Sequence, residues 1–245
     1  MTDVGPVSGH EDPPGEAPWA MQIVVRAEKA ALPTRTAAIE AAAIAAVQLL
    51  ASPEAQPGGP WHAPVERWLS GRFRKIVRHA RGSAWAKACE LPGITASHRG
   101  AEVRAFVPGP MDAVPRELAK LQLQGLDLPD DRAIGDWAPE GSALGNRPSN
   151  GWALVIAMGP GVALSIGKSA AQAAHASTMA WLQMSADERQ LWAANWPGLA
   201  VVFPETGAFA RYERSAPVRV VDAGFTELSG PALTCVADWR RSCSA

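Results

Sequence analysis

Two alanine-rich stretches, each preceded by a short apolar run, constrain the fold of this 245-residue chain more than any other feature. The first apolar run covers residues 21–25 and the second covers residues 154–158, and a turn separates each run from its alanine-rich stretch. Short apolar runs bounded by turns are typical of buried strands, and long alanine-rich segments are typical of helices. A strand, a turn and a helix are therefore expected twice.

The two halves of the chain align without a gap over this region. The alignment pairs Ile23 with Ile156 and Arg35 with Lys168. A second helical stretch and a further apolar run follow in each half, at residues 101–107 and 199–204. Most matched identities are alanine, so the shared order of elements is the stronger observation. We interpret it as an internal duplication of a strand-helix-helix-strand unit.

Strands that alternate with helices predict an α/β fold. We expect a mixed, mostly parallel sheet with helices on both faces, built from two similar halves. In the second half, additional strands are predicted at residues 218–221 and 233–237.

Segments rich in proline, glycine and polar residues indicate where these units begin and end. Residues 1–17 are predicted to be a disordered tail and residues 129–150 a linker. The first half then covers residues 18–128, and the second covers residues 151–245.

The composition narrows the class of protein. The formal net charge is -1, and the three cysteines are widely spaced, which favours neither a disulfide framework nor a zinc site. The N-terminus lacks the pattern of a secretory signal, and the longest apolar stretch, residues 37–51, contains Glu40 and is too short to cross a bilayer. We expect a soluble cytoplasmic protein without a metal, a cofactor or a membrane partner.

A run of cations stands out in the first half, where five arginines and one lysine lie between positions 67 and 81. Phe73, Ile76 and Val77 add an apolar stripe, so we expect a basic helix that packs through this stripe and presents its cations outward. A run of positive charges without acidic residues is suited to binding the phosphate backbone of a nucleic acid. The alternative is that the run forms a solvated helix face without a ligand. The candidate tRNA-binding residues are Arg67, Arg72, Arg74, Lys75, Arg78 and Arg81.

The second alanine-rich helix holds the candidate catalytic residues. Lys168, Gln172 and His175 are spaced i, i+4 and i+7, so they project from one face of a helix. A lysine beside the open N–H groups of a helix start attracts anions, either a phosphate or an oxyanion. Asp222 ends a predicted strand, and the order of strands brings it to the same sheet edge as Lys168.

Together these side chains suit the attack of water on an ester. Asp222 can orient and deprotonate the water or pair with Lys168, while Gln172 and Thr226 hold the substrate or the water. No serine or cysteine has a base at local spacing, so direct water attack is favoured over a covalent intermediate. Each residue also has a structural alternative, and His175 is more typical of a packed histidine than of a catalyst.

The two segments that contain these residues resemble the peptidyl-tRNA hydrolases of the archaeal and eukaryotic type (type II). The GKxAAQxxHA-like helix start of that family is matched at residues 167–176, and its DAGxTx[IL]-like turn is matched at residues 222–228. The resemblance implies hydrolysis, without a metal, of the ester that joins a peptide to the 3′ end of tRNA. It further implies that the catalytic residues are Lys168, Gln172, Asp222 and Thr226.

The first half lacks these residues, because Arg35 replaces the lysine, Ile39 the glutamine and Ala42 the histidine. We therefore expect it to be catalytically silent. Since enzymes of this family are often homodimers, a silent half suggests a monomeric pseudo-dimer with a built-in partner, and a homodimer is the alternative. Gel filtration at the mass of a dimer would contradict the built-in partner.

Two other functions fit parts of the sequence. The stretch before Ser169 looks like a phosphate loop, but Val162 stands where that motif requires its first glycine. A non-catalytic tRNA-binding or RNA-binding protein is the second alternative, and the basic segment supports it. Replacing Lys168 or Asp222 separates the two, because only an enzyme has hydrolysis to lose.

Overall fold

The computed structural model describes residues 12, 15–131, 154–161, 163–194, 198–222 and 231–239. Most of the predicted tail and linker lies outside these ranges. Thr226, the rest of the turn after Asp222 and the side chain of Asp222 also lie outside the described part.

The first half contains one sheet in which β1 is central. Its elements are β1 (Trp19–Arg26), α1 (Arg35–Ala51), a 3-10 turn (Pro53–Ala55), α2 (His62–Leu69), β2 (Arg74–Ala80), α3 (Gly82–Cys89), β3 (Gly93–His98), β4 (Ala101–Phe106), β5 (Gly109–Pro110) and α4 (Arg116–Ala119). The strand order is β2-β1-β4-β3, and β5 pairs with the start of β1. The β1–β2 pair is parallel, whereas β4 runs antiparallel to both β1 and β3.

The second half repeats this arrangement. Its elements are β6 (Leu154–Met158), α5 (Ile166–Gln183), α6 (Ala186–Ala194), β7 (Leu199–Val202), α7 (Thr206–Ser215), β8 (Val218–Asp222) and β9 (Ala232–Asp238). The strand order is β7-β6-β9-β8, with β6–β7 parallel and β9 antiparallel to both β6 and β8. The two sheets therefore share one strand order and one set of strand directions.

The α/β class and the mixed sheet are confirmed, with two differences in detail. The chain forms two sheets, and each contains a single parallel pair among its described strands, so the expectation of a mostly parallel sheet is met only roughly. In addition, the second strand of the first half is β2, and the apolar run at residues 101–107 belongs to β4.

The predicted basic helix is wrong. Helix α2 ends at Leu69, and the cationic residues that follow form β2, the parallel neighbour of β1. The segment is a strand because its polar side chains have partners on both faces of the sheet. Arg78 reaches Gln22 on one face, while Lys75 lies beside aromatic rings on the other. Strong tertiary contacts of this kind override a charge pattern that favours a helix.

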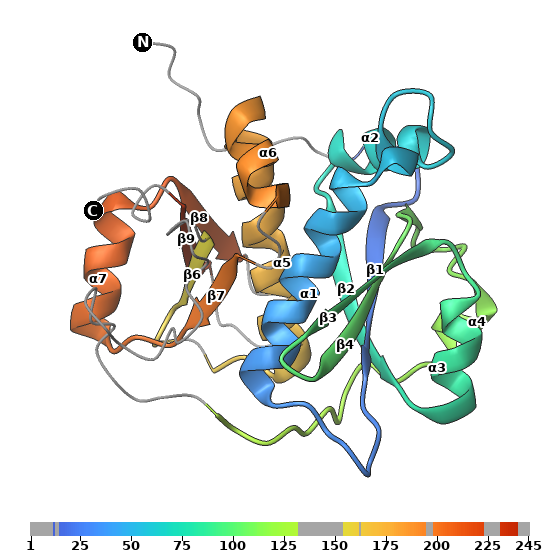
Figure 1. Cartoon of the computed structure of the whole chain (residues 1–245), viewed down its shortest axis with the longest axis horizontal. Coiled ribbons are helices and arrows are strands. Elements are labelled where there is room, and N and C mark those ends of the chain that lie inside the picture. The colour runs from blue at the N-terminus through green and yellow to red at the C-terminus, as the bar shows by residue number, and fades with distance from the viewer. Residues whose placement is uncertain are drawn as a thin grey trace.

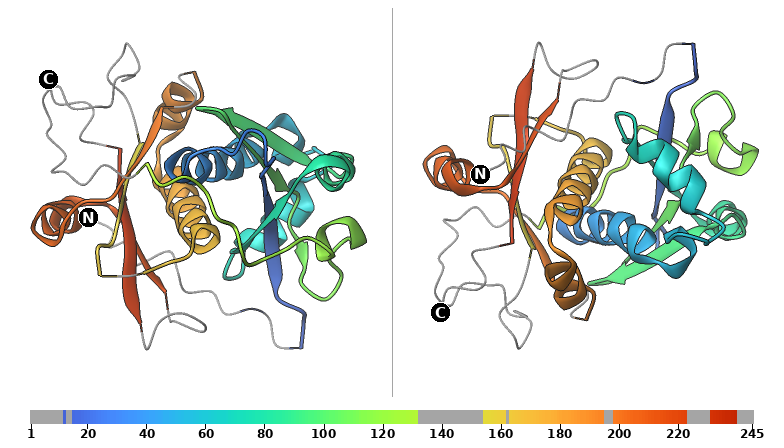
Figure 2. Two further views of the ribbon diagram at one scale, coloured as in Figure 1. Left: turned by 90° about the horizontal axis from the view of Figure 1, so that it is seen from below. Right: turned by 90° about the horizontal axis from the view of Figure 1, so that it is seen from above.

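Helices α1 and α5 pack against each other between the two sheets (Figures 1 and 2). Helices α3 and α4 cover the outer face of the first sheet and α7 covers that of the second, which gives the layers α/β/α/β/α. The alanines of α1 are buried and small, so the central helices approach closely. The Ser177 hydroxyl of α5 donates to the Ala43 carbonyl of α1 at 3.0 Å. Within the described ranges, every helix is too short or too polar to cross a bilayer.

Candidate functional site

The first turn of α5 positions Lys168 at the edge of the second sheet where β6 ends. Ser165 caps the helix, and its side chain accepts a hydrogen bond from the backbone N–H of Lys168 at 3.4 Å. Such a cap satisfies one of the donors that a helix start leaves open and fixes the first turn. Lys168 is partly exposed, and the positive end of the helix dipole adds to its charge.

Gln172, one turn after Lys168, is held on the second sheet. The hydroxyl of Thr234 in β9 donates to Gln172 Oε1 at 3.0 Å and lies 3.1 Å from the carbonyl oxygen of Val220. The Cys235 thiol lies 3.6 Å from the backbone oxygen of Gln172. Thr234 is fully buried, so this contact restricts the Gln172 side chain to one orientation.

A β-bulge makes this contact possible. Thr234 and Cys235 are neighbours, so a regular strand would turn their side chains to opposite faces of the sheet. Cys235 pairs with Val220, whereas Leu233 pairs with Val221, which leaves Thr234 as the extra residue. Bulges redirect side chains, and this one lets both Thr234 and Cys235 face α5.

The strand directions place the end of β8 beside the start of α5. Strands β6 and β8 are each antiparallel to β9, so they run in the same direction and end at the same edge. Met158, the last residue of β6, pairs with Cys235, which pairs in turn with Val220, two residues before Asp222. The backbone of Asp222 and the first turn of α5 therefore lie at one edge of the sheet, as the sequence predicted.

The buried cysteine at this sheet is not a nucleophile. Burial raises the pKa of Cys235 to about 12, so its thiol stays protonated at neutral pH.

His175 contacts the first half of the chain. Its imidazole stacks on the Phe73 ring, with ring centroids 4.6 Å apart and planes 8° from parallel. Phe73 has a φ of 30°, in the left-handed region that bulky side chains rarely adopt. Lys75 Nζ lies 4.9 Å from the centroid of the Phe73 ring and 4.7 Å from that of Trp68. These four residues form what we call the aromatic interface between the halves.

The electrostatics of the aromatic interface favour a packing role for His175. Burial and the nearby Lys75 hold the pKa of His175 well below its ordinary value, so the imidazole is neutral at neutral pH. Burial also holds the pKa of Lys75 well below its ordinary value.

This shift predicts a loss of stability in acid. Below pH 6.5, the ordinary pKa of histidine, the unfolded chain binds a proton at His175 that the folded chain does not bind. The free energy of unfolding should therefore fall as the pH is lowered below that value, by up to about 1.4 kcal/mol per pH unit from this residue. Replacing His175 by Phe, which preserves a stacked ring, should remove this part of the slope in urea titrations.

The matched control for this prediction is His62→Gln, which removes a partly exposed histidine outside the aromatic interface. This variant should keep the slope of the unmodified chain. Equal slopes for His175→Phe and the unmodified chain would contradict the assignment of the acid sensitivity to His175.

His98 occupies the position in the first sheet that Asp222 has in the second. In the first sheet, Ile23 pairs with Ala105, which pairs in turn with Ile94. In the second sheet, the aligned Ile156 pairs with Ala237, which pairs with Val218. Ile94 and Val218 therefore occupy equivalent positions in β3 and β8. His98 lies four residues after Ile94, and Asp222 lies four residues after Val218, so His98 and Asp222 are also at equivalent positions.

A buried carboxylate contacts His98 at this place in the first half. Glu40 of α1 is 3% exposed, and its Oε2 lies 2.9 Å from His98 Nε2 and accepts a hydrogen bond from Arg99 Nη1 at 3.1 Å. Its Oε1 accepts a hydrogen bond from the backbone N–H of Val201 at 3.0 Å. Val201 belongs to β7, the edge strand of the second sheet. We call these four residues the Glu40 cluster, and no motif in the sequence indicates it.

Arg35, which the alignment pairs with Lys168, also joins the two halves. It is the first residue of α1, and its Nη2 lies 3.3 Å from the carbonyl oxygen of Leu164 and 3.4 Å from Ser169 Oγ. The starts of α1 and α5 are therefore in direct contact. Asp131 lies beside them, and its carboxylate accepts a hydrogen bond from the backbone N–H of Thr36 at 2.8 Å.

The candidate tRNA-binding cations do not share one outward face. Two of them lie in the interior on opposite faces of β2, since Arg78 is 9% exposed and Lys75 belongs to the aromatic interface. Two others, Arg67 and Arg74, form ion pairs with acidic residues near the N-terminus. The exposed members of the set are Arg72 and Arg81.

Comparisons of the chain with protein-family models, with curated proteins and with solved structures find no match. In the part of the chain that the structure describes, no group of three histidine, cysteine or acidic residues is placed to hold a metal ion.

Proposed function

We propose that the second half hydrolyses the ester bond between tRNA and a peptide or an N-blocked amino acid, by direct attack of water. The arrangement at the edge of the second sheet supports this proposal most. Lys168 lies in the first turn of α5, the bulged β9 fixes Gln172 one turn later, and β8 ends at Asp222 at the same edge.

Each of these groups suits one need of the reaction. Attack of water places negative charge on the carbonyl oxygen, and Lys168 with the N–H groups of the helix start would stabilise that oxyanion. The attacking water must lose a proton, and Asp222 would accept it. Gln172 and Thr226 would position the water or the ribose. The bond between the carbonyl carbon and the ribose oxygen then breaks, and the ribose oxygen takes up a proton to release tRNA.

In this proposal the first half is catalytically silent and takes the place of a second subunit. Its helix α1 packs along α5 between the sheets, and it contacts the second half through Arg35 and Glu40. These contacts support a monomeric pseudo-dimer in which one half orders the other.

The proposal is tested by hydrolysis of N-acetylated aminoacyl-tRNA. The purified chain should release free tRNA, and Lys168→Met should lower kcat by about a hundredfold or more, as the loss of an oxyanion contact does. The affinity for tRNA should fall much less, because one cation is a small part of the contact with a phosphate backbone. Lys87→Met, at an exposed position of α3, is the matched control and should keep full activity.

The other outcomes are equally informative. Tight tRNA binding without hydrolysis would replace the proposal with the non-catalytic tRNA-binding alternative. If neither hydrolysis nor binding occurs, tRNA is not the partner of this chain. Equal losses in Lys168→Met and Lys87→Met would show that the effect is one of net charge and not of position.

A further inference from the structure

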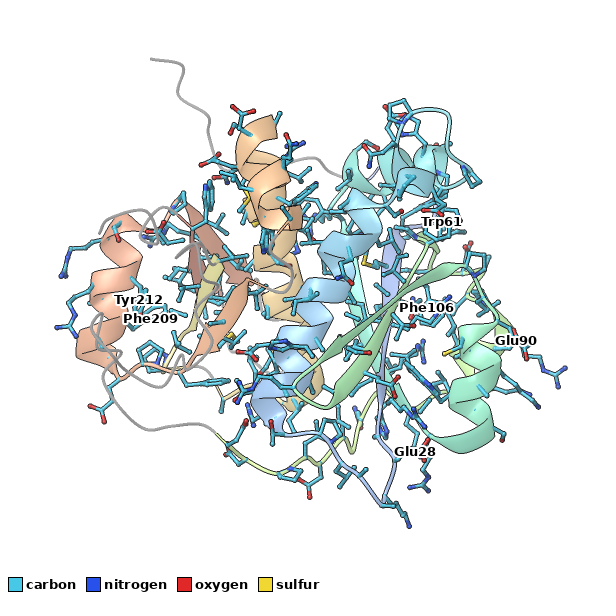
Figure 3. All side chains as sticks on the ribbon, viewed as in Figure 1. Glu28, Trp61, Glu90, Phe106, Phe209 and Tyr212 are labelled. Carbon is cyan, nitrogen blue, oxygen red and sulfur yellow. The ribbon has the colours of Figure 1, made fainter. Side chains whose placement is uncertain are left out.

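The outer face of the first sheet contains a pocket of ≈ 270 Å³. It lies on the side of the sheet that α3 and α4 cover in Figure 1, and Phe106, which is labelled in Figure 3, is one of its lining residues. Its walls are apolar and rich in proline, with Pro92, Pro110 and Leu118 among the lining residues. Gln22 of β1 is the single polar side chain in the described lining.

Gln22 lines this pocket, and a neighbouring arginine occupies the oxygen of its amide group. Arg78 Nε donates to Gln22 Oε1 at 3.0 Å, so the oxygen of the amide faces Arg78 and its Nε2 faces away. Gln22 is only 5% exposed, and its Nε2 has no hydrogen-bond partner among the described residues. Because Gln22 lines the pocket, a ligand there can accept a hydrogen bond from this donor.

Two arginines contact residues that line the pocket, and their hydrogen bonds go to neutral oxygens. Arg78 Nη1 donates to the carbonyl oxygen of Leu121 at 3.0 Å, and Arg104 Nη2 donates to that of Leu91 at 2.8 Å. The guanidinium of Arg104 also lies 5.6 Å from the centroid of the Phe106 ring. Neither arginine forms an ion pair within the described part of the chain, and burial lowers the pKa of both.

We propose that this pocket binds a small apolar carboxylate whose anionic end accepts hydrogen bonds from Gln22 Nε2. Arg78, which is buried, and Arg104, which is partly buried, supply positive potential without a counter-charge among the described residues, and an anion at Gln22 would supply that charge. The proline-rich walls suit a ring or a short branched chain. The volume lies near the ~300 Å³ lower end of small-ligand sites, which limits the ligand to roughly one ring and its substituents.

This inference does not depend on the proposed function. The pocket belongs to the first half and lies on the outer face of its sheet, whereas the candidate catalytic residues lie at the edge of the second sheet. A failure of either proposal therefore leaves the other standing.

Isothermal titration of the full chain with sodium benzoate and with benzamide tests the assignment. Benzoate should bind, and benzamide should bind about tenfold more weakly, because hydrogen bonds to a charged acceptor are stronger than those to a neutral one. Absence of benzoate binding would overturn the site. Equal affinities for the two probes would overturn its assignment to carboxylates.

Two variants locate the binding in this pocket. Gln22→Glu keeps an acceptor for Arg78 Nε but replaces the donor with a second carboxylate oxygen, so benzoate affinity should fall by at least about tenfold. Ala113→Trp places a large ring at the exposed rim of the pocket and should block entry. Ala186→Trp, at an exposed position of α6, is the control and should bind benzoate normally. Unchanged benzoate affinity in either pocket variant would overturn the proposal.

Discussion

Replacing Asp222 by Asn should lower kcat for N-acetylated aminoacyl-tRNA by about a hundredfold or more. Asparagine has the same size as aspartate and still forms hydrogen bonds, but it cannot accept the proton of the attacking water. The fold should be preserved, because the position contributes a backbone pair with Ala232 at the end of β8. Single-turnover rates at saturating enzyme, together with thermal unfolding of the same preparation, measure both effects.

Asp187→Asn is the matched control for this experiment. Asp187 is an exposed residue in the first turn of α6, so its replacement makes the same chemical change away from the candidate site and should leave the rate unchanged. If Asp222→Asn keeps the rate of the unmodified chain, Asp222 is not the proton acceptor. Combining Asp222→Asn with Lys168→Met adds a further check. If both groups act in the same transition state, the double variant should lose little more activity than the more damaging single variant loses.

The parts of the fold that the sequence predicted are those that local pattern decides. The apolar runs in β1 and β6 and the alanine-rich α1 and α5 follow from hydrophobic runs, turns and helix propensity. The gapless alignment of Ile23 with Ile156 is consistent with the two ladders, because each residue pairs with a valine in a parallel neighbour and with an alanine in an antiparallel one.

The strand β2 could not be predicted in this way, because its partners are distant in the sequence. Arg78 is buried through contact with Gln22, and Lys75 lies over the rings of Phe73 and Trp68. A strand that places a cation on each of its faces shows no alternation of polar and apolar residues, so its composition resembles that of a basic helix.

The candidate site was predictable in position but not in its contacts. The spacing of Lys168 and Gln172 predicted that both lie on one face of a helix, and strand order predicted the shared edge with Asp222. The contact between Gln172 and Thr234 depends on a one-residue bulge in β9, which no local pattern in that strand indicates. Glu40 was likewise hidden, because one of its partners belongs to the other half of the chain.

Replacing Glu40 by Ala should lower the free energy of unfolding by about 3 kcal/mol, because it removes a buried acceptor on which several donors depend. The change leaves the side chain of His98, the guanidinium of Arg99 and the backbone N–H of Val201 without their shared acceptor. It also leaves a cavity at the contact between α1 and β7, which adds to the loss. Urea unfolding at neutral pH, followed by tryptophan fluorescence, measures this change.

Two further variants separate the charge of Glu40 from its hydrogen bonds. Glu40→Gln keeps an oxygen that can accept from Val201 and nearly fills the same volume, so it should cost less than Glu40→Ala. Glu66→Ala removes an exposed glutamate of α2 and should change stability by no more than about 0.5 kcal/mol. If Glu40→Ala costs as little as Glu66→Ala, the Glu40 cluster does not hold the halves together. A large loss would instead show that Glu40 helps to fix β7, the edge strand of the second sheet, to the first half.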